Sequence, residues 1–437
     1  MRLPVEFEIY MKNLLKDDYD KYYHSLSLSP VKGMRINTLK ASVDEAKKYF
    51  NGEKIPYANA LYVENEKYGA HPLHHAGVIY MQEPSSMLPV SSVDFDGDEL
   101  VLDLCAAPGG KSGQIAEKIP FGTLLANEIN NDRAKILRQN IERLGYKNVI
   151  ITNSEPKKIE KLGAIFDIVL VDAPCSGEGM FRKDENAINE WNASSPHSNA
   201  TRQLLLLDSA SKLVKDGGKI IYSTCTFNEY EDENVIEEFL NSHQDFSEIE
   251  ANARVNDFTL KAKHGRKLFP HIAPGEGQYM CVLVRSGQAT YPKLKCRLNE
   301  LGSSQKNIVN KFFNEVGIEN NFDLRAKDDI IYILPPKHID TSNLYVLSYG
   351  VILGKIEKNR LIPSHNFFTA YGDIVKNSIN LPLSDERVNK YLKGEEITYD
   401  TNLHGYAALK VDGHTLGAVK ISDSTLKNHY PKALRLY

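Results

Sequence analysis

Residues 100–112 read Leu-Val-Leu-Asp-Leu-Cys-Ala-Ala-Pro-Gly-Gly-Lys-Ser, and this stretch decides the fold. An apolar run followed by small residues and Pro-Gly-Gly is typical of a buried parallel strand that turns tightly into a helix. Gly109 and Gly110 have no Cβ, so a ligand can approach the turn closely. Helix N-termini favour anionic or polar ligands. The stretch therefore indicates a nucleotide-like ligand at the carboxyl end of the first strand of an α/β sheet.

Two common phosphate-binding motifs do not fit this turn. Gly-Lys-Ser at 110–112 resembles the end of a P-loop, but the P-loop needs a glycine five positions before its last glycine, where this chain has Cys105. The dinucleotide pattern G-x-G-x-x-G also fails, because the glycines fall at 109, 110 and 113. An ordinary strand-to-helix turn remains the alternative to a ligand loop.

From residue 100 the chain alternates between apolar runs and amphipathic stretches, which predicts a doubly wound, mostly parallel, Rossmann-like α/β sheet. Ligands bind such sheets beyond the carboxyl ends of the strands. The predicted strands cover residues 101–104, 122–129, 149–152, 166–171 and 219–223, and the predicted helices cover 132–144, 199–214 and 229–243.

The flanking regions indicate additional modules. Residues 1–92 are expected to form a small α+β module that binds RNA, and residues 93–287 are expected to form the core. Residues 288–348 are expected to be a connecting α+β region and 349–437 a separate carboxyl-terminal domain, with a hairpin at Asp412-Gly413. Residues 286–437 carry 20 Lys and Arg against 16 Asp and Glu, whereas the whole chain has net charge −4. A modestly basic carboxyl-terminal third beside an acidic body is compatible with RNA binding, and uneven surface charge without function is the alternative.

The composition excludes several classes of protein. The five cysteines contain no C-x-x-C pair, so neither a zinc ribbon nor a redox dithiol is expected. Their odd number and the lack of a signal peptide predict a reducing, cytoplasmic location. No run of 18 apolar residues occurs, so no membrane span is expected.

Three polar positions follow predicted strands and are candidates for chemistry. Cys175 lies in the turn after the fourth strand, and Cys225 lies in the turn after the fifth. Both strand ends open onto the predicted ligand crevice, and we expect both thiols to be functional and not merely buried small residues. Glu128 ends the second strand, where an acidic residue commonly binds ribose hydroxyls.

Cys-Ala-Ala-Pro-Gly-Gly-Lys at 105–111, Asp-Ala-Pro-Cys-Ser-Gly-Glu-Gly at 172–179 and Ser-Thr-Cys-Thr at 223–226 occur in this order at the expected strand ends. Together they resemble the Nop/Sun family of RNA 5-methylcytosine methyltransferases, which use S-adenosylmethionine. Gly-Glu-Gly-Met-Phe-Arg-Lys-Asp at 177–184, the length and the basic carboxyl-terminal third resemble the RsmF-type subgroup. Those bacterial enzymes modify small-subunit ribosomal RNA and end in a PUA-like RNA-binding domain, which the resemblance places at 349–437.

The resemblance implies specific roles for the residues at these strand ends. Cys225 would be the nucleophile, Cys175 would assist product release, and Asp172 would bind the target cytosine and border the cofactor. Glu128 would bind the ribose, Arg133 would lie beside the cofactor, and Glu155 is the nearest match to an adenine-side aspartate that the family usually has. The loop around the cofactor would consist of Cys105, Ala106, Ala107, Pro108, Gly109, Gly110 and Lys111.

The resemblance also predicts the partners. We expect 16S ribosomal RNA or the small ribosomal subunit as substrate, no metal, no membrane and a monomeric protein. Transfer RNA as substrate, an RNA-binding ribosome-assembly factor without catalysis, and a small-molecule methyltransferase are the alternatives. Arg35, Asn37, Arg182 and Lys183 are candidate RNA contacts, each with a solvated surface group as the alternative.

Overall fold

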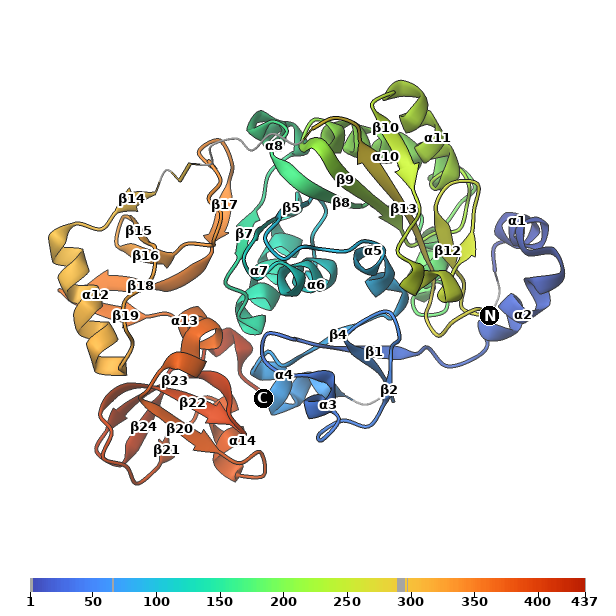
Figure 1. Ribbon diagram of the computed structural model, residues 1–437. Coiled ribbons are helices and arrows are strands. Elements are labelled where there is room, and N and C mark those ends of the chain that lie inside the picture. Colours follow the sequence, from blue (N-terminus) through green and yellow to red (C-terminus); the bar gives the residue numbers. More distant parts are fainter. Residues whose placement is uncertain (1–2, 65–66, 289–294, 297, 437) are drawn as a thin grey trace.

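The computed structural model describes residues 3–64, 67–288, 295–296 and 298–436. Within these ranges the chain forms one large sheet and three smaller sheets (Figure 1). The amino-terminal sheet lies beneath the core, and two carboxyl-terminal sheets lie to its left in this view. No helix in the described ranges is both long and apolar enough to cross a bilayer.

The central sheet confirms the predicted doubly wound α/β core: its middle strands are parallel, and antiparallel strands extend it at both edges into a mixed sheet. In order across the sheet, its strands are β11 (Leu260–Lys261), β12 (Arg266–Leu268), β13 (Gln278–Arg285), β9 (Val214–Thr224), β8 (Phe166–Asp172), β5 (Leu100–Asp103), β6 (Thr123–Asn127), β7 (Val149–Thr152) and β17 (Val346–Tyr349), with β10 (Phe246–Ile249) beside β13. The neighbouring pairs from β9 to β7 are all parallel. Their carboxyl ends therefore meet at one edge of the sheet.

Helices cover both faces of this sheet, which is why its strands are apolar on both sides. On one face lie α6 (Gly110–Lys118) and α7 (Asn131–Leu144), and on the other α10 (Ser195–Ser211) and α11 (Glu233–Ser242). Ile115 and Leu137 pack from the first pair, and Leu207 and Ile236 from the second, all fully buried. Burial of this kind supplies most of the driving force for folding.

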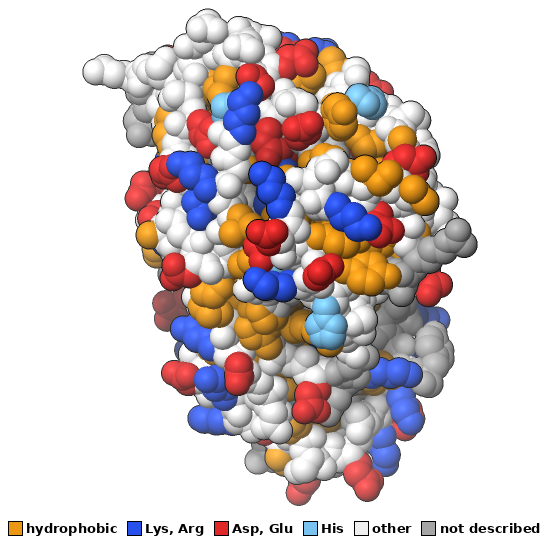
Figure 2. Space-filling model, turned by 90° about the vertical axis from the view of Figure 1, so that its right-hand side faces the viewer, with side chains coloured by type: hydrophobic (Ala, Val, Ile, Leu, Met, Phe, Trp, Pro, Cys, Tyr) orange, Lys and Arg blue, Asp and Glu red, His pale blue; other side chains and the backbone are white. Residues whose placement is uncertain are grey.

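The expected amino-terminal module is divided between two places. Helix α5 (Leu88–Ser91) packs against β9 and β13 of the core sheet. The strands β2 (Glu53–Lys54), β3 (Ala60–Val63), β1 (Lys32–Ile36) and β4 (Ile79–Gln82) form a sheet in that order, with the short helices α3 (Val43–Ala46) and α4 (Pro72–His75). By contrast, α1 (Val5–Leu15) and α2 (Tyr19–Ser25) lie beside the core (Figure 1). Phe7 and Tyr22 of these helices pack with Phe181 and Phe227, which belong to loops that follow β8 and β9. Figure 2 views the molecule from the side on which α1 and α2 lie, and basic and acidic side chains are interspersed over this face.

The first carboxyl-terminal module crosses the boundary expected at 348/349. Its sheet runs β14 (Asn299–Glu300), β15 (Leu324–Lys327), β16 (Ile330–Ile333), β18 (Val351–Glu357) and β19 (Arg360–Pro363), flanked by α12 (Ser303–Val316) and α13 (His365–Tyr371). Between β16 and β18 the chain forms β17, which pairs antiparallel with β7 and so extends the core sheet. The boundary therefore lies inside this module, because strands on both sides of it share one sheet.

A second carboxyl-terminal sheet follows, built from β20 (Ser378–Leu381), β22 (Gly405–Val411), β23 (His414–Ser422), β24 (Thr425–Asn428) and β21 (Ile397–Thr398), with α14 (Glu386–Leu392). The predicted hairpin at Asp412-Gly413 is confirmed, since Val411 pairs with His414. This domain packs on the amino-terminal sheet: apolar residues of the two regions form one buried cluster, and the His75 ring lies 2.7 Å from the Tyr430 hydroxyl.

Candidate active site

Two cysteines meet at the carboxyl ends of β8 and β9. Their Sγ atoms lie 3.2 Å apart, and the backbone N–H of Cys225 donates to Cys175 Sγ over 3.3 Å. The approach follows from the sheet, because Asp172 at the end of β8 pairs in parallel register with Ser223 near the end of β9. The hydrogen bond with Cys225, together with burial, holds the pKa of Cys175 well above its usual range. This contact and burial therefore favour the protonated form of Cys175 beside the second sulfur.

Asp172 lies next to this pair and is held from two sides. Lys111 donates to its Oδ2 over 2.8 Å, and the Ser223 hydroxyl donates to its Oδ1 over 2.7 Å. Burial acts to lower the pKa of Lys111, but the charge and hydrogen bond of Asp172 outweigh it and raise that pKa. The ion pair thus ties the loop before α6 to the end of β8.

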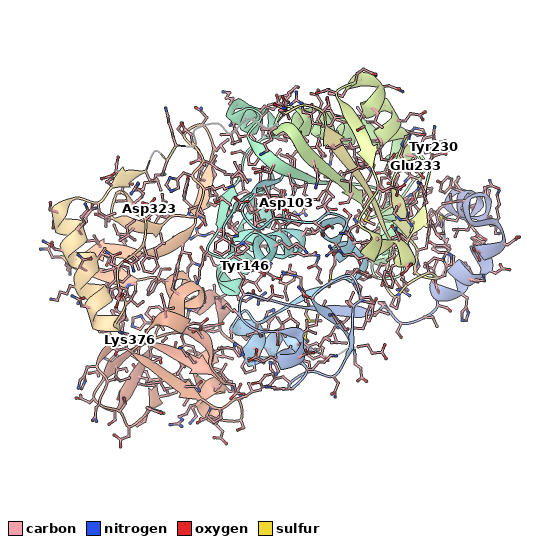
Figure 3. The ribbon with its side chains drawn as sticks, in the orientation of Figure 1. Asp103, Tyr146, Tyr230, Glu233, Asp323 and Lys376 are labelled. Atoms are coloured by element: carbon pink, nitrogen blue, oxygen red, sulfur yellow. The ribbon has the colours of Figure 1, made fainter. Side chains whose placement is uncertain are left out.

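The 105–111 loop joins β5 to α6 as the sequence predicts. Gly109 has φ +111°, a conformation that favours glycine. Beneath the loop, Asp103 is 1% exposed and accepts a hydrogen bond from the Ser112 hydroxyl at 2.6 Å (Figure 3). Burial raises the pKa of Asp103 to about 7. Burial also raises the pKa of Cys105, so this third thiol is not activated for attack.

The loop after β6 carries Glu128, one residue beyond the end of the strand, and this residue is 3% exposed. Its Oε1 accepts from the backbone N–H of Asn130 at 2.9 Å, and its Oε2 lies 3.6 Å from the Arg133 guanidinium. Arg133 also donates to the carbonyl oxygen of Ala107 over 2.6 Å. Glu128 and Arg133 are therefore brought to the 105–111 loop.

Asn153, and not Glu155, reaches this loop from the end of β7. Its amide donates to the carbonyl oxygens of Glu128 and Ile129 over 2.6 and 2.8 Å. Glu155 is exposed at the start of α8 (Pro156–Ile159), with its side chain outside the loop contacts. The adenine-side role of Glu155 therefore stays a prediction, and the side chain that contacts the loop after β6 is that of Asn153.

Comparison with known proteins shows which family has this sequence and fold. Four family profiles match successive parts of the chain: "N-terminal domain of 16S rRNA methyltransferase RsmF" over 3–84, "16S rRNA methyltransferase RsmB/F" over 91–284, "RsmF rRNA methyltransferase first C-terminal domain" over 311–370 and "Methyltransferase RsmF PUA domain" over 378–436. Ribosomal RNA small subunit methyltransferase F of Psychromonas ingrahamii is 30% identical, with 92% of this chain and 90% of the relative covered. The chain belongs to the RsmF family of methyltransferases. The protein of the same name from Shewanella sp. strain ANA-3 is 31% identical with the same coverage.

Solved structures agree with the fold of this RsmF-family chain. A methyltransferase homologue from Pyrococcus horikoshii is 27% identical, with TM-score 0.54 over 63% of this chain and 93% of that chain. NSun6 from the same organism, solved with SFG, has TM-score 0.56 at 22% identity over 65% of this chain and 99% of that one, which supports the fold alone. The profile for the PUA domain begins at 378, which agrees with the start of the last sheet at β20 and not with the expected 349.

The groups at the strand ends fit an S-adenosylmethionine-type cofactor. Such a ligand has ribose hydroxyls, an ammonium group and a sulfonium, and it needs acceptors and negative charge. Glu128 supplies a buried carboxylate at the end of the second core strand. Asp103 supplies another, and its Oδ1 has no hydrogen-bond partner. No group of three or more His, Cys, Asp or Glu in the described ranges has the arrangement of a metal site.

Burial contradicts the prediction that Arg35 and Asn37 contact RNA. Both are 1% exposed. Arg35 forms a buried ion pair with Glu117 and donates to Gln82 Oε1 over 3.1 Å and to the Tyr146 hydroxyl over 3.2 Å (Figure 3 labels Tyr146). The Asn37 amide donates to two backbone carbonyls, at 2.9 Å each. These side chains attach the amino-terminal sheet to the core, because they bind partners in the amino-terminal module and partners in the core.

Arg182 also has an internal role, whereas Lys183 is exposed. The Arg182 side chain is 5% exposed and donates to both carboxylate oxygens of Glu276, at 2.9 and 3.0 Å. It further donates to the Ser25 carbonyl of α2 over 3.0 Å. Its prediction as an RNA contact is therefore contradicted, while Lys183 stays a prediction.

Sequence reasoning missed two buried carboxylates behind the cysteines, Glu178 and Glu231. Glu178 lies within the quoted Gly-Glu-Gly motif, so a charged residue between two glycines was a visible signal. Glu231 had no such signal, because its segment looked like an acidic helix start. In the structure α11 begins only at Glu233, and Glu231 belongs to the loop that follows Cys225.

Proposed function

We propose that this chain methylates C5 of a cytosine in 16S ribosomal RNA through a transient bond between Cys225 Sγ and C6 of the base. The observation that supports it best is the contact of the two sulfur atoms beside Asp172. A lone nucleophile would not need a second, protonated thiol at hydrogen-bond distance. The names of the relatives, which specify the small ribosomal subunit, support the choice of RNA.

The chemistry requires a covalent step because C5 of cytosine is a weak nucleophile. Cys225 adds as a thiolate to C6, and the electron pair of the C5–C6 double bond moves toward C5 and the ring. Protonation or strong hydrogen bonding at N3 of the ring, with Asp172 as the partner, would stabilise the developing negative charge. S-adenosylmethionine, when bound, supplies the methyl group that C5 accepts. Glu128, Asp103 and the 105–111 loop would hold it, so that the donor and C5 are oriented together.

Release reverses the first step. The C5 proton leaves to a base, its electron pair reforms the C5–C6 double bond, and Cys225 departs from C6 as a thiolate. Cys175 is placed to give that sulfur a proton over the 3.2 Å contact. The target base must leave its stack to reach this edge of the sheet, as in other enzymes that act on bases. The PUA domain and the amino-terminal module would bind the surrounding RNA.

The test is bisulfite mapping of ribosomal and transfer RNA from a strain that lacks this protein. We expect loss of 5-methylcytosine at one or more positions of 16S ribosomal RNA, with restoration by the intact gene. An unchanged 16S profile would reject the proposal. Loss in transfer RNA instead would keep the reaction and replace the substrate.

A further inference from the structure

Two buried carboxylates lie behind the cysteine pair, and the proposed reaction uses neither of them. Glu178 is 2% exposed and Glu231 is fully buried. A buried carboxylate is costly to the fold unless its oxygens accept hydrogen bonds. Here all four carboxylate oxygens accept at least one, and the donors belong mainly to the two loops that carry the cysteines.

Glu178 binds the three residues that directly follow Cys225. Its Oε2 accepts from the Thr226 hydroxyl at 2.6 Å, from the Phe227 N–H at 3.0 Å and from the Asn228 N–H at 3.1 Å. Its Oε1 accepts from the Trp191 indole at 3.1 Å. Three donors thus converge on one oxygen, which fixes the path of the chain just after the nucleophile.

Glu231 binds the loop around Cys175. The N–H of Ser176 donates to its Oε2 at 3.0 Å, and the Gln203 amide donates to the same oxygen at 2.9 Å. Gln203 also donates to the carbonyl oxygen of Pro174 over 3.0 Å. The residues on either side of Cys175 are therefore attached to Glu231, one directly and one through Gln203.

Further contacts hold the two loops in place. The Asn228 amide lies 3.1 Å from Glu178 Oε1 and 2.8 Å from Glu231 Oε1, and so bridges the two carboxylates. On the other side of the nucleophile loop, Lys267 and Tyr10 both donate to the Phe227 carbonyl, at 2.7 and 3.2 Å. The backbone of the two loops therefore determines the distance between the two cysteines.

We propose that the two carboxylates divide the positioning of the cysteine pair: Glu178 sets Cys225 for attack on C6, and Glu231 sets Cys175 for product release. Both are positioning residues, since their contacts are with the loops. The inference rests on the proposed function, because it assigns each carboxylate to one half of that reaction. It predicts that replacing Glu178 slows formation of the adduct, whereas replacing Glu231 slows its resolution.

The test compares Glu178→Gln with Glu231→Gln in single-turnover reactions on substrate RNA, with adducts resolved on denaturing gels. Glu178→Gln should slow adduct formation by about tenfold or more, the change expected when a hydrogen bond to a charged group is lost, and no adduct should accumulate. Glu231→Gln should form adduct at nearly the wild-type rate but resolve it about tenfold more slowly, so that adduct accumulates while Cys175 is present.

Matched variants control for folding. Glu229→Gln changes an exposed carboxylate in the same loop and should leave both steps unchanged. Thr226→Val removes one donor to Glu178 with little change of shape, and Gln203→Met removes one donor to Glu231. Each should reproduce the defect of its carboxylate in weaker form. Thermal unfolding and cofactor binding are measured for every variant, and steps are compared only among folded proteins.

The proposed division of roles would be wrong if each carboxylate variant slowed both steps equally and Thr226→Val and Gln203→Met did the same. So would a folded Glu231→Gln protein that resolves adducts at the wild-type rate. If the wild-type protein makes no 5-methylcytosine and Cys175→Ala traps no adduct, the proposed function itself fails, and the inference fails with it. The wild-type and Cys175→Ala reactions therefore separate the two failures.

Discussion

Cys175 Sγ and Cys225 Sγ lie 3.2 Å apart although 50 positions separate the two residues in the chain. The contact arises because β8 and β9 are parallel neighbours whose carboxyl ends reach the same edge. The contact and burial favour the protonated form of Cys175, the residue proposed to act in release, and Cys225 is the proposed nucleophile. The first two predictions separate these roles.

Cys225→Ala should abolish methyl transfer and leave cofactor binding within about twofold of wild type, because the side chain lies outside the 105–111 loop and only the covalent step is lost. Incorporation of labelled methyl groups into RNA and calorimetric titration with S-adenosylmethionine measure the two quantities. Full methylation by this variant would refute the covalent mechanism.

Cys175→Ala should form the covalent RNA–protein adduct and fail to resolve it, because the thiol that protonates the departing sulfur is missing. A slowly migrating band on denaturing gels that requires Cys225 is the expected result, and the double variant with Cys225→Ala is the control. Absence of the band would remove the release role of Cys175 and leave attack by Cys225 intact.

The order of the core elements could be predicted from the sequence because the spacing of apolar residues and the turn residues between elements are local features. The Pro-Gly-Gly turn and the strands that end at Cys175 and Cys225 placed the site at one edge of a parallel sheet. Strand ends were less certain: the predicted strand 122–129 stops at Asn127, so Glu128 lies in the loop, where its carboxylate is free to turn inward.

Other features depend on contacts between distant parts of the chain, which local patterns do not encode. The pairing of β17 with β7 joins residues that lie almost 200 positions apart, and the attachment of α1 and α2 beside the core loops is equally long-range. Arg35 alternates with apolar residues in its strand, so the pattern predicts a solvated face. That face meets α6 instead, where Glu117 compensates the charge.

Arg35→Met should destabilise the protein by roughly 3–5 kcal/mol, because it leaves the Glu117 carboxylate buried without its counter-charge. Urea unfolding measures the change. The double variant Arg35→Met/Glu117→Leu should recover most of the loss, since it removes the uncompensated charge. Unchanged stability together with weakened RNA binding would return Arg35 to the role of an RNA contact.

Lys183→Met should weaken RNA binding and leave the stability of the fold nearly unchanged, because this side chain is exposed. We expect stability within about 0.5 kcal/mol of wild type, as for most surface substitutions. The apparent dissociation constant for substrate RNA should rise, and its dependence on salt should weaken, since a phosphate-binding cation releases a counterion. Filter binding at several salt concentrations measures both quantities. If the dependence of the dissociation constant on salt is unchanged, Lys183 does not contact a phosphate.

Asp103 should make the protein less stable as the pH rises through neutrality. Its pKa is about 7 in the fold, whereas an unfolded aspartate titrates near 3.9. Between these values the folded chain binds a proton that the unfolded chain has lost, so the free energy of unfolding falls as pH increases and levels off above the folded pKa. Urea unfolding should show a drop from about pH 5 to pH 8 that is larger by about 2–3 kcal/mol in wild type than in Asp103→Asn. Asp132 is an exposed aspartate on α7, so Asp132→Asn should keep the wild-type dependence of unfolding free energy on pH. The same pH dependence in Asp103→Asn and wild type would show that Asp103 is ionised throughout.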